Sequence, residues 1–204
     1  RESKCESYEF RITVSDGGSQ DDTCAICEKY SCESKDAPIF IVRQPKDGRR
    51  GRGPVLRRGA DYVQKLVGGY QGLFVFLHAD CAVPVTFFDA VAGSMYSSVR
   101  TNPECGFCRM DFGKETMNFK VLEWIASFDS PFTSFGDQGI VVTKKKYLSL
   151  GGMPQQSLCE DIEFFCRCRN SGAKPVCLPI TIRVSPRKFD QRGVFLYMAQ
   201  CCVV

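Results

Sequence analysis

Short runs of β-branched and aromatic residues alternate with helix-length segments along most of this chain. The run Leu-Phe-Val-Phe-Leu at residues 73–77 is continuously apolar, as expected of a strand that is buried on both faces of a sheet. Such alternation is typical of helices packed on a mostly parallel sheet, so an α/β fold is expected. Strands are predicted at residues 10–14, 39–42, 73–77 and 140–143, and helices at residues 21–30, 60–66, 86–97 and 119–128 and from residue 160 onward.

Length and composition favour one domain that spans residues 1–204. A chain of 204 residues with 44% hydrophobic content can bury a substantial core, and 25% charged residues with a net charge of +4 indicate a soluble surface. No apolar run of about twenty residues is present, so no membrane span is expected. The chain begins with Arg1 and without a signal-like segment, which predicts a truncated or processed N-terminus whose targeting segment has been removed.

Two adjacent carboxylates, Glu160 and Asp161, stand where a Gly-Gly-Met-Pro turn leads into a predicted helix. Backbone N–H groups in a first helical turn lack partners and the helix dipole favours negative charge there. An ionised Asp161 could therefore be held in a fixed orientation as a base. The alternative is that both carboxylates are ordinary acidic residues of a first helical turn and have no catalytic role.

His78 and Asp80 follow the predicted strand at residues 73–77. Ligands of open α/β sheets bind at the carboxyl ends of strands, and a carboxylate there can hold a divalent cation against a diphosphate. One imidazole with one carboxylate suits manganese better than calcium. The alternative for His78 is a hydrogen-bonded structural residue.

A third candidate is the turn Asp16-Gly17-Gly18-Ser19, which follows the predicted strand at residues 10–14. Glycine lets the backbone approach a ligand closely, and an aspartate at a strand end can accept hydrogen bonds from a ribose or a base. An ordinary turn between a strand and a helix is the alternative interpretation.

These motifs, in this order, resemble those of family two glycosyltransferases. The likeness extends over residues 10–193 and is greatest to a small branch that carries Leu-His-Ala-Asp in place of Asp-x-Asp. It rests on six short segments: Asp16-Gly17-Gly18-Ser19, Gly51-Arg52-Gly53 with Gly59-Ala60, Leu77-His78-Ala79-Asp80, Gly136-Asp137-Gln138-Gly139, Gly151-Gly152-Met153-Pro154 and Glu160-Asp161.

The resemblance implies a single Rossmann-like GT-A domain that transfers a sugar from a nucleotide-diphosphate donor to an acceptor. Inversion at the sugar and a divalent cation, Mn²⁺ or Mg²⁺, are implied as well. Carried over by position, the resemblance implies that Asp16 and Gly17 contact the nucleoside and that Arg52 contacts the donor. It implies that His78 and Asp80 bind the cation and that Asp137 and Gln138 contact the acceptor. Asp161 would be the general base, with Glu160 beside it.

The chain also departs from the family pattern. The first strand of the family, which ends in a proline and an Asn-Glu pair, is missing, and Val55 and Arg57 replace an expected glutamine and asparagine. Arg187-Lys188-Phe189 stands where the branch tends to have two arginines and a tryptophan. These changes keep a second hypothesis open: a catalytically degenerate transferase fold that serves as a structural or accessory subunit with protein partners.

Positive charge gathers in residues 43–58 and 144–146. These basic segments are expected to neutralise a donor diphosphate or to form solvated loops. RNA binding is less favoured, because no aromatic residues alternate with the arginines. Anionic lipid or an acidic protein partner is a further alternative.

Thirteen cysteines are an odd number, so a closed set of disulfides cannot use them all. The pairs Cys24/Cys27 and Cys105/Cys108 could share a zinc ion if they met in space, but free thiols in a reducing compartment or organelle are favoured. Trp124, the only tryptophan, is expected to be a core or half-buried packing residue, and stacking on the acceptor is the alternative.

Overall fold

The computed structural model describes residues 9–34, 37–45, 48, 51–69, 71–96, 102–130 and 136–192. The chain divides into two compact units, one of Arg1–Tyr70 with Gln155–Leu158 and one of Gln71–Pro154 with Cys159–Val204. The apolar segment at residues 194–204, which the sequence suggests as a packed helix or a partner-binding segment, lies outside the described residues. In the described part of the chain, no helix is long and apolar enough to cross a membrane.

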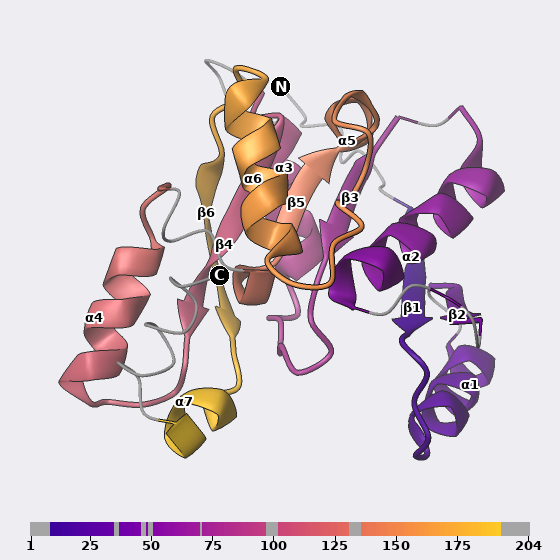
Figure 1. Cartoon of the computed structure of the whole chain (residues 1–204), viewed down its shortest axis with the longest axis horizontal. Coiled ribbons are helices and arrows are strands. Elements are labelled where there is room, and N and C mark those ends of the chain that lie inside the picture. Colours follow the sequence, from indigo (N-terminus) through magenta and orange to yellow (C-terminus); the bar gives the residue numbers. More distant parts are fainter. Residues whose placement is uncertain are drawn as a thin grey trace, which may run out of the picture. The chain divides into compact units, whose positions relative to one another are not determined.

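The first unit is a strand–helix–strand unit followed by a long helix (Figure 1). Strand β1 (Ile12–Asp16) and strand β2 (Ile39–Arg43) pair in parallel, with Ile12 opposite Ile39 and Asp16 opposite Arg43. Helix α1 (Thr23–Glu33) connects them, and the Asp21 carboxylate accepts hydrogen bonds from the backbone N–H and the hydroxyl of Thr23 at its start. Both predicted strands and the predicted helix are therefore confirmed, with boundaries shifted by up to three residues.

Helix α2 (Arg52–Val67) begins eight residues before the predicted start at residue 60. Pro54 is tolerated in its first turn because an N–H there would have no intrahelical partner. Gly51 precedes the helix with φ +109°, and a Cβ on it would lie 2.5 Å from Ser157 Cα, so only glycine fits. On the sheet side of α2, Ser15 Oγ donates to the Val55 carbonyl at 2.6 Å.

The second unit contains a four-stranded sheet in the order β3-β5-β4-β6, covered by helices (Figure 1). Strand β5 runs antiparallel to β3 and β4, whereas β4 and β6 run parallel. The strands are β3 (Leu73–Phe76), β4 (Cys105–Asp111), β5 (Ile140–Thr143) and β6 (Val176–Arg183). The other elements are α3 (Phe87–Tyr96), α4 (Met117–Ala126), the 3₁₀ turn η1 (Gly136–Gln138), α5 (Lys144–Ser149), α6 (Glu160–Asn170) and α7 (Arg187–Arg192).

The core of the second unit lies between this sheet and helix α3. Phe87, Val91 and Met95 line the buried face of α3 at helical spacing and pack in one cluster with the side chains of β4 and β6. A second group of rings extends this core, with Phe112 5.1 Å from both Phe119 and Phe189 between ring centroids. Because Phe119 belongs to α4 and Phe189 to α7, these rings fix two helices against the end of β4.

Strands β4 and β6 are absent from the sequence-based prediction. Strand β6 contains Pro179, which is rare in central strands because it cannot donate a ladder hydrogen bond. Here β6 is an edge strand, and the β4/β6 register slips between Cys108 and Arg109, opposite the Leu178–Thr181 step that contains the proline. The irregularity places Pro179 where no ladder bond is needed.

Candidate functional site

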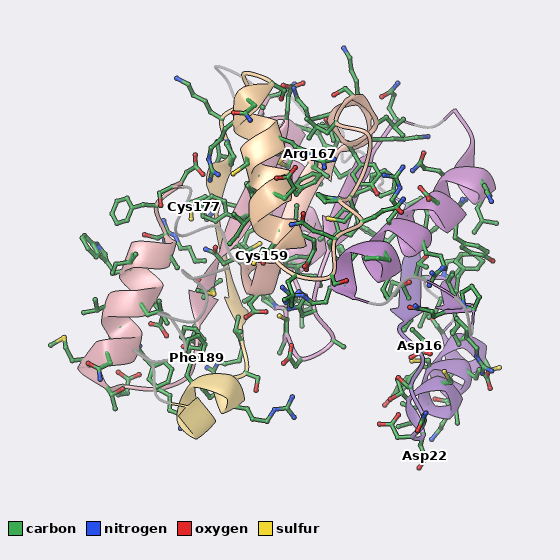
Figure 2. All side chains as sticks on the ribbon, in the orientation of Figure 1. Asp16, Asp22, Cys159, Arg167, Cys177 and Phe189 are labelled. Atoms are coloured by element: carbon green, nitrogen blue, oxygen red, sulfur yellow. The ribbon has the colours of Figure 1, made fainter. Side chains whose placement is uncertain are left out.

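In the first unit, the Asp16 side chain orders the turn that follows β1 (Figure 2). Its carboxylate accepts hydrogen bonds from the Ser19 hydroxyl at 2.5 Å, from the Ser19 N–H at 3.2 Å and from the Gly18 N–H at 3.0 Å. The Ser19 hydroxyl and these N–H groups hold the pKa of Asp16 below its ordinary value of 3.8. Asp16 is therefore an ionised, 7% exposed carboxylate at the end of a strand.

The other predicted donor residues of this unit are Gly17, within that turn, and Arg52, in helix α2. A Cβ on Gly17 would lie 3.6 Å from Val55 Cγ2, which is ordinary contact, so the backbone of the turn packs directly on α2. Arg52 is the first residue of α2 and is exposed. The N-terminus of α2 is the positive end of the helix dipole, which is a place where an anionic ligand is stabilised.

In the second unit, His78 follows β3 and is oriented by a carboxylate. His78 Nδ1 lies 2.5 Å from Asp137 Oδ1, which is close enough for the ring N–H to donate to the carboxylate. Residues 78–81 form a turn, in which the Cys81 N–H donates to the His78 carbonyl at 3.1 Å. The Cys81 thiol donates to the Asp137 carbonyl at 3.5 Å. Asp80 lies within this turn and is exposed.

The η1 turn binds a different element through each of its three residues. The Gly136 N–H donates to Asp161 Oδ2 at 2.5 Å, and Asp137 holds His78. Gln138 is fully buried, and its side-chain amide donates to the Ala126 carbonyl at 2.5 Å and to the Cys108 carbonyl at 3.4 Å. The turn thus joins the ends of β3 and α4, strand β4 and the start of α6.

Helix α6 begins with the predicted pair of carboxylates, and this prediction is confirmed. Asp161 Oδ2 accepts from Gly136, and Asp161 Oδ1 accepts from the Ile162 N–H at 2.9 Å. Glu160 is only 1% exposed. Cys159, labelled at the start of α6 in Figure 2, has φ 56° and ψ 29°, a left-handed conformation that is strained for any residue with a Cβ.

Helix α6 also requires glycine at position 136. A Cβ there would lie 2.8 Å from Asp161 Oδ2 and 3.2 Å from Asp161 Cβ. The sequence identifies Gly136 as part of a motif but gives it no role, because its contact lies 25 residues away along the chain. Strain at Cys159 and this close approach place two special backbone positions next to the predicted base, and such positions cluster at functional sites.

The residues at the end of β3 fit a divalent cation as a partial ligand set. A metal-binding histidine usually donates its second ring N–H to a carboxylate, and His78 Nδ1 lies 2.5 Å from Asp137 Oδ1. No group of three metal-ligating side chains occurs in the described residues. His78 and Asp80 would therefore supply the protein's share, and diphosphate oxygens and water the remainder.

Two further expectations have different outcomes. Trp124 was expected to pack, but this prediction is wrong: it is 64% exposed on α4, and its ring meets only that of Phe128 among the described aromatic contacts. Cys105 and Cys108 are buried in β4, as expected of small apolar side chains, whereas helix α1, which carries Cys24 and Cys27, buries none of its residues.

Comparisons with known proteins bear on the fold. No family model matches the sequence, and no curated protein matches it. A solved structure described as the mannosyltransferase PcManGT from Pyrobaculum calidifontis, in complex with GDP-Man and Mn²⁺, is similar with a TM-score of 0.62 and 16% identity. The likeness covers 96% of this chain and 55% of that protein, so the chain spans about half of its length. The α/β fold expected from the sequence is confirmed, and it is similar to the fold of that mannosyltransferase.

Proposed function

We propose that this protein transfers a sugar from a nucleotide-diphosphate donor to an acceptor with inversion at the sugar, as a family two transferase with one GT-A domain. The observation that carries the proposal is the η1 turn, where adjacent residues hold the predicted base Asp161 and the predicted cation ligand His78. The glycosyltransferase fold supplies its context. The similar structure contains GDP-mannose and Mn²⁺, which makes this donor and this cation the first to test.

Asp161 is the candidate base. The backbone N–H groups of Gly136 and Ile162 hold its carboxylate in a fixed orientation. In the reaction the carboxylate takes the proton from the acceptor hydroxyl, whose oxygen forms the new bond to the sugar carbon. The bond from that carbon to the diphosphate breaks, and the electron pair leaves with the nucleoside diphosphate. Glu160 lies beside this base and is buried.

The diphosphate that leaves carries negative charge, and three residues are assigned to it. His78 and Asp80 would hold the divalent cation, whose positive charge stabilises the leaving group. Arg52, at the start of α2, would contact the donor, and Asp16 and Gly17 the nucleoside. Asp137 orients His78 through its carboxylate, and its predicted acceptor contact, like that of Gln138, would use the backbone of the η1 turn.

Thermal unfolding with nucleotide-sugars tests the proposal. The purified protein is unfolded with GDP-mannose and with uridine, cytidine and thymidine analogues, each with and without Mn²⁺. A ligand at about a hundred times its Kd adds roughly 2.7 kcal/mol to the free energy of unfolding of a protein that binds it only when folded. A stabilisation by one nucleotide that requires Mn²⁺ is expected, and no stabilisation by any of them would favour the accessory-subunit hypothesis.

Replacement of the base separates chemistry from binding. Asp161→Asn keeps an oxygen that can accept the Gly136 N–H, so the fold and donor binding are retained while transfer falls by about 10²–10⁴-fold. Glu163→Gln is the matched control. Glu163 lies on the same helix, and its carboxylate Oε1 lies 2.7 Å from Arg167 Nε. Equal transfer rates in the two variants would contradict the assignment of Asp161.

A further inference from the structure

The first unit contains an open pocket of about 470 Å³ along one flank of helix α2. Volumes of about 300–1,000 Å³ are typical of sites for small molecules. Four of its lining residues recur at the spacing of one helical flank, and Val42 of β2 and Gln155 close the opposite side; the four are Pro54, Arg58, Asp61 and Lys65.

This flank is not the one that carries Arg52. At about 100° per residue, Arg58, Asp61 and Lys65 lie roughly 120–180° around the helix axis from Arg52. The face toward the Asp16 turn is also different, since Val55 packs against Gly17 and accepts a hydrogen bond from Ser15. The pocket is therefore separate from the residues assigned to the sugar donor.

The charges in the pocket do not balance. Arg57, Arg58 and Lys65 supply three positive charges, and Asp61 supplies one negative charge and lies 3.7 Å from Arg57 Nε. Arg58 Nη1 is buried and has no hydrogen-bond partner, and Lys65 forms no ion pair with any residue that the structure describes. A buried guanidinium N–H without an acceptor is destabilising, so an anion bound there would supply the missing partner.

We infer that this pocket binds a phosphate monoester or diphosphate of a small molecule. The arginine fork and the lysine ammonium both suit phosphate oxygens. Tyr62, whose ring lies 5.9 Å from that of Phe40, gives the wall an aromatic surface for the organic part of the ligand. A concave site lined from one helix fits a small molecule better than the extended backbone of a nucleic acid. The inference does not depend on the proposed transferase activity.

Calorimetric titration of the full chain with pyrophosphate tests the inference. EDTA is present throughout, so that a cation-dependent donor site contributes nothing to the signal. Saturable binding is expected, with Arg58→Gln weakening it about tenfold or more and Lys65→Gln weakening it severalfold, since each removes a charge-assisted contact. Lys65 is exposed, so its variant retains the fold even if Arg58→Gln does not.

A matched control removes one positive charge elsewhere in the same unit. Lys29→Gln alters an exposed lysine on α1 that pairs with Glu33. This variant is expected to bind pyrophosphate within twofold of the parent protein. The inference is overturned if the parent protein does not bind pyrophosphate, or if Lys29→Gln weakens binding as much as Arg58→Gln.

A competition titration distinguishes the small molecule from a polymer. A single-stranded RNA oligonucleotide is added to the pyrophosphate complex at the same ionic strength, because such contacts weaken with salt. Displacement only at a large excess of RNA phosphate supports a small-molecule site. Displacement at stoichiometric RNA would show a nucleic-acid surface and overturn the inference.

Discussion

Replacing Gly136 by alanine is the sharpest test of how the second unit holds its candidate base. A Cβ at this position would lie 2.8 Å from Asp161 Oδ2 and 3.2 Å from Asp161 Cβ, distances that real Cβ atoms avoid. The backbone of Gly136 is not in the left-handed region, so alanine is compatible with its φ value. The substitution therefore acts through this one contact and displaces the carboxylate.

The expected loss of stability follows from that contact. A hydrogen bond from an N–H to a charged group contributes about 1.5–3 kcal/mol, and the Gly136 bond to Asp161 is 2.5 Å long. Alanine in place of glycine also restricts the unfolded chain, which contributes about 0.4–1 kcal/mol of stability. The net expectation is that Gly136→Ala lowers the free energy of unfolding by about 0.5–2.6 kcal/mol.

Urea unfolding followed by tryptophan fluorescence measures this loss in the relevant unit, because Trp124 is the only tryptophan and lies in the second unit. Gly93→Ala is the matched control: a Cβ on Gly93 meets nothing within 4 Å, and alanine in helix α3 should add about 0.5–1 kcal/mol.

A double-mutant cycle decides whether Asp161 is responsible. In an Asp161→Gly background the close contacts with Oδ2 and Cβ and the hydrogen bond are all gone, so Gly136→Ala should stabilise the protein by about 0.4–1 kcal/mol. An equal loss of stability in both backgrounds would refute the reasoning, since the effect would then come from some other neighbour of the turn.

Two further predictions concern cysteines. Burial raises the pKa of the Cys108 thiol from 9.0 to about 12, so the folded state holds this proton more tightly than the unfolded state. The free energy of unfolding should therefore fall by up to about 1.4 kcal/mol per pH unit as the pH rises from 9 to 12. In urea titrations, Cys108→Ala should remove this contribution to the fall of the free energy of unfolding with pH. Cys159→Val should destabilise the protein by about 1–2 kcal/mol because Cys159 has φ 56°, whereas Cys159→Asn should unfold within about 0.5 kcal/mol of the parent; equal midpoints for the two variants would contradict the strain.

The sequence predicts strands where side-chain shape dictates them. The runs at residues 39–42, 73–77 and 140–143 are rich in β-branched and aromatic residues, and each forms a strand within one residue of the predicted boundary. Strand β4 reads Cys-Gly-Phe-Cys-Arg-Met-Asp, whose propensity is weak, and it forms because β5 and β6 pair with both of its edges. Tertiary pairing of this kind has no local signal.

The candidate site likewise combines residues that the local sequence identifies with residues that it does not. Asp161 and His78 can be identified locally, since one lies in the first turn of a helix and the other follows a strand. Their partners Gly136 and Asp137 cannot be assigned in this way, because the contacts join segments that are distant in sequence. The prediction for Trp124 is wrong for a related reason. Apolar character predicts burial, but the buried face of α4 is formed by Phe119, Leu122 and Ala126.

The η1 turn makes the two halves of the second unit's site interdependent. Three consecutive residues share one short backbone segment, so Gly136 and Asp137 cannot shift independently of each other. Their position is set by Gln138, whose buried amide binds the carbonyls of Ala126 and Cys108. Loss of that anchor would leave two buried carbonyls short of a donor and would release the turn that orients both Asp161 and His78. The candidate base and the candidate cation ligand therefore have a common support in the buried core, rather than separate supports in the loops that carry them.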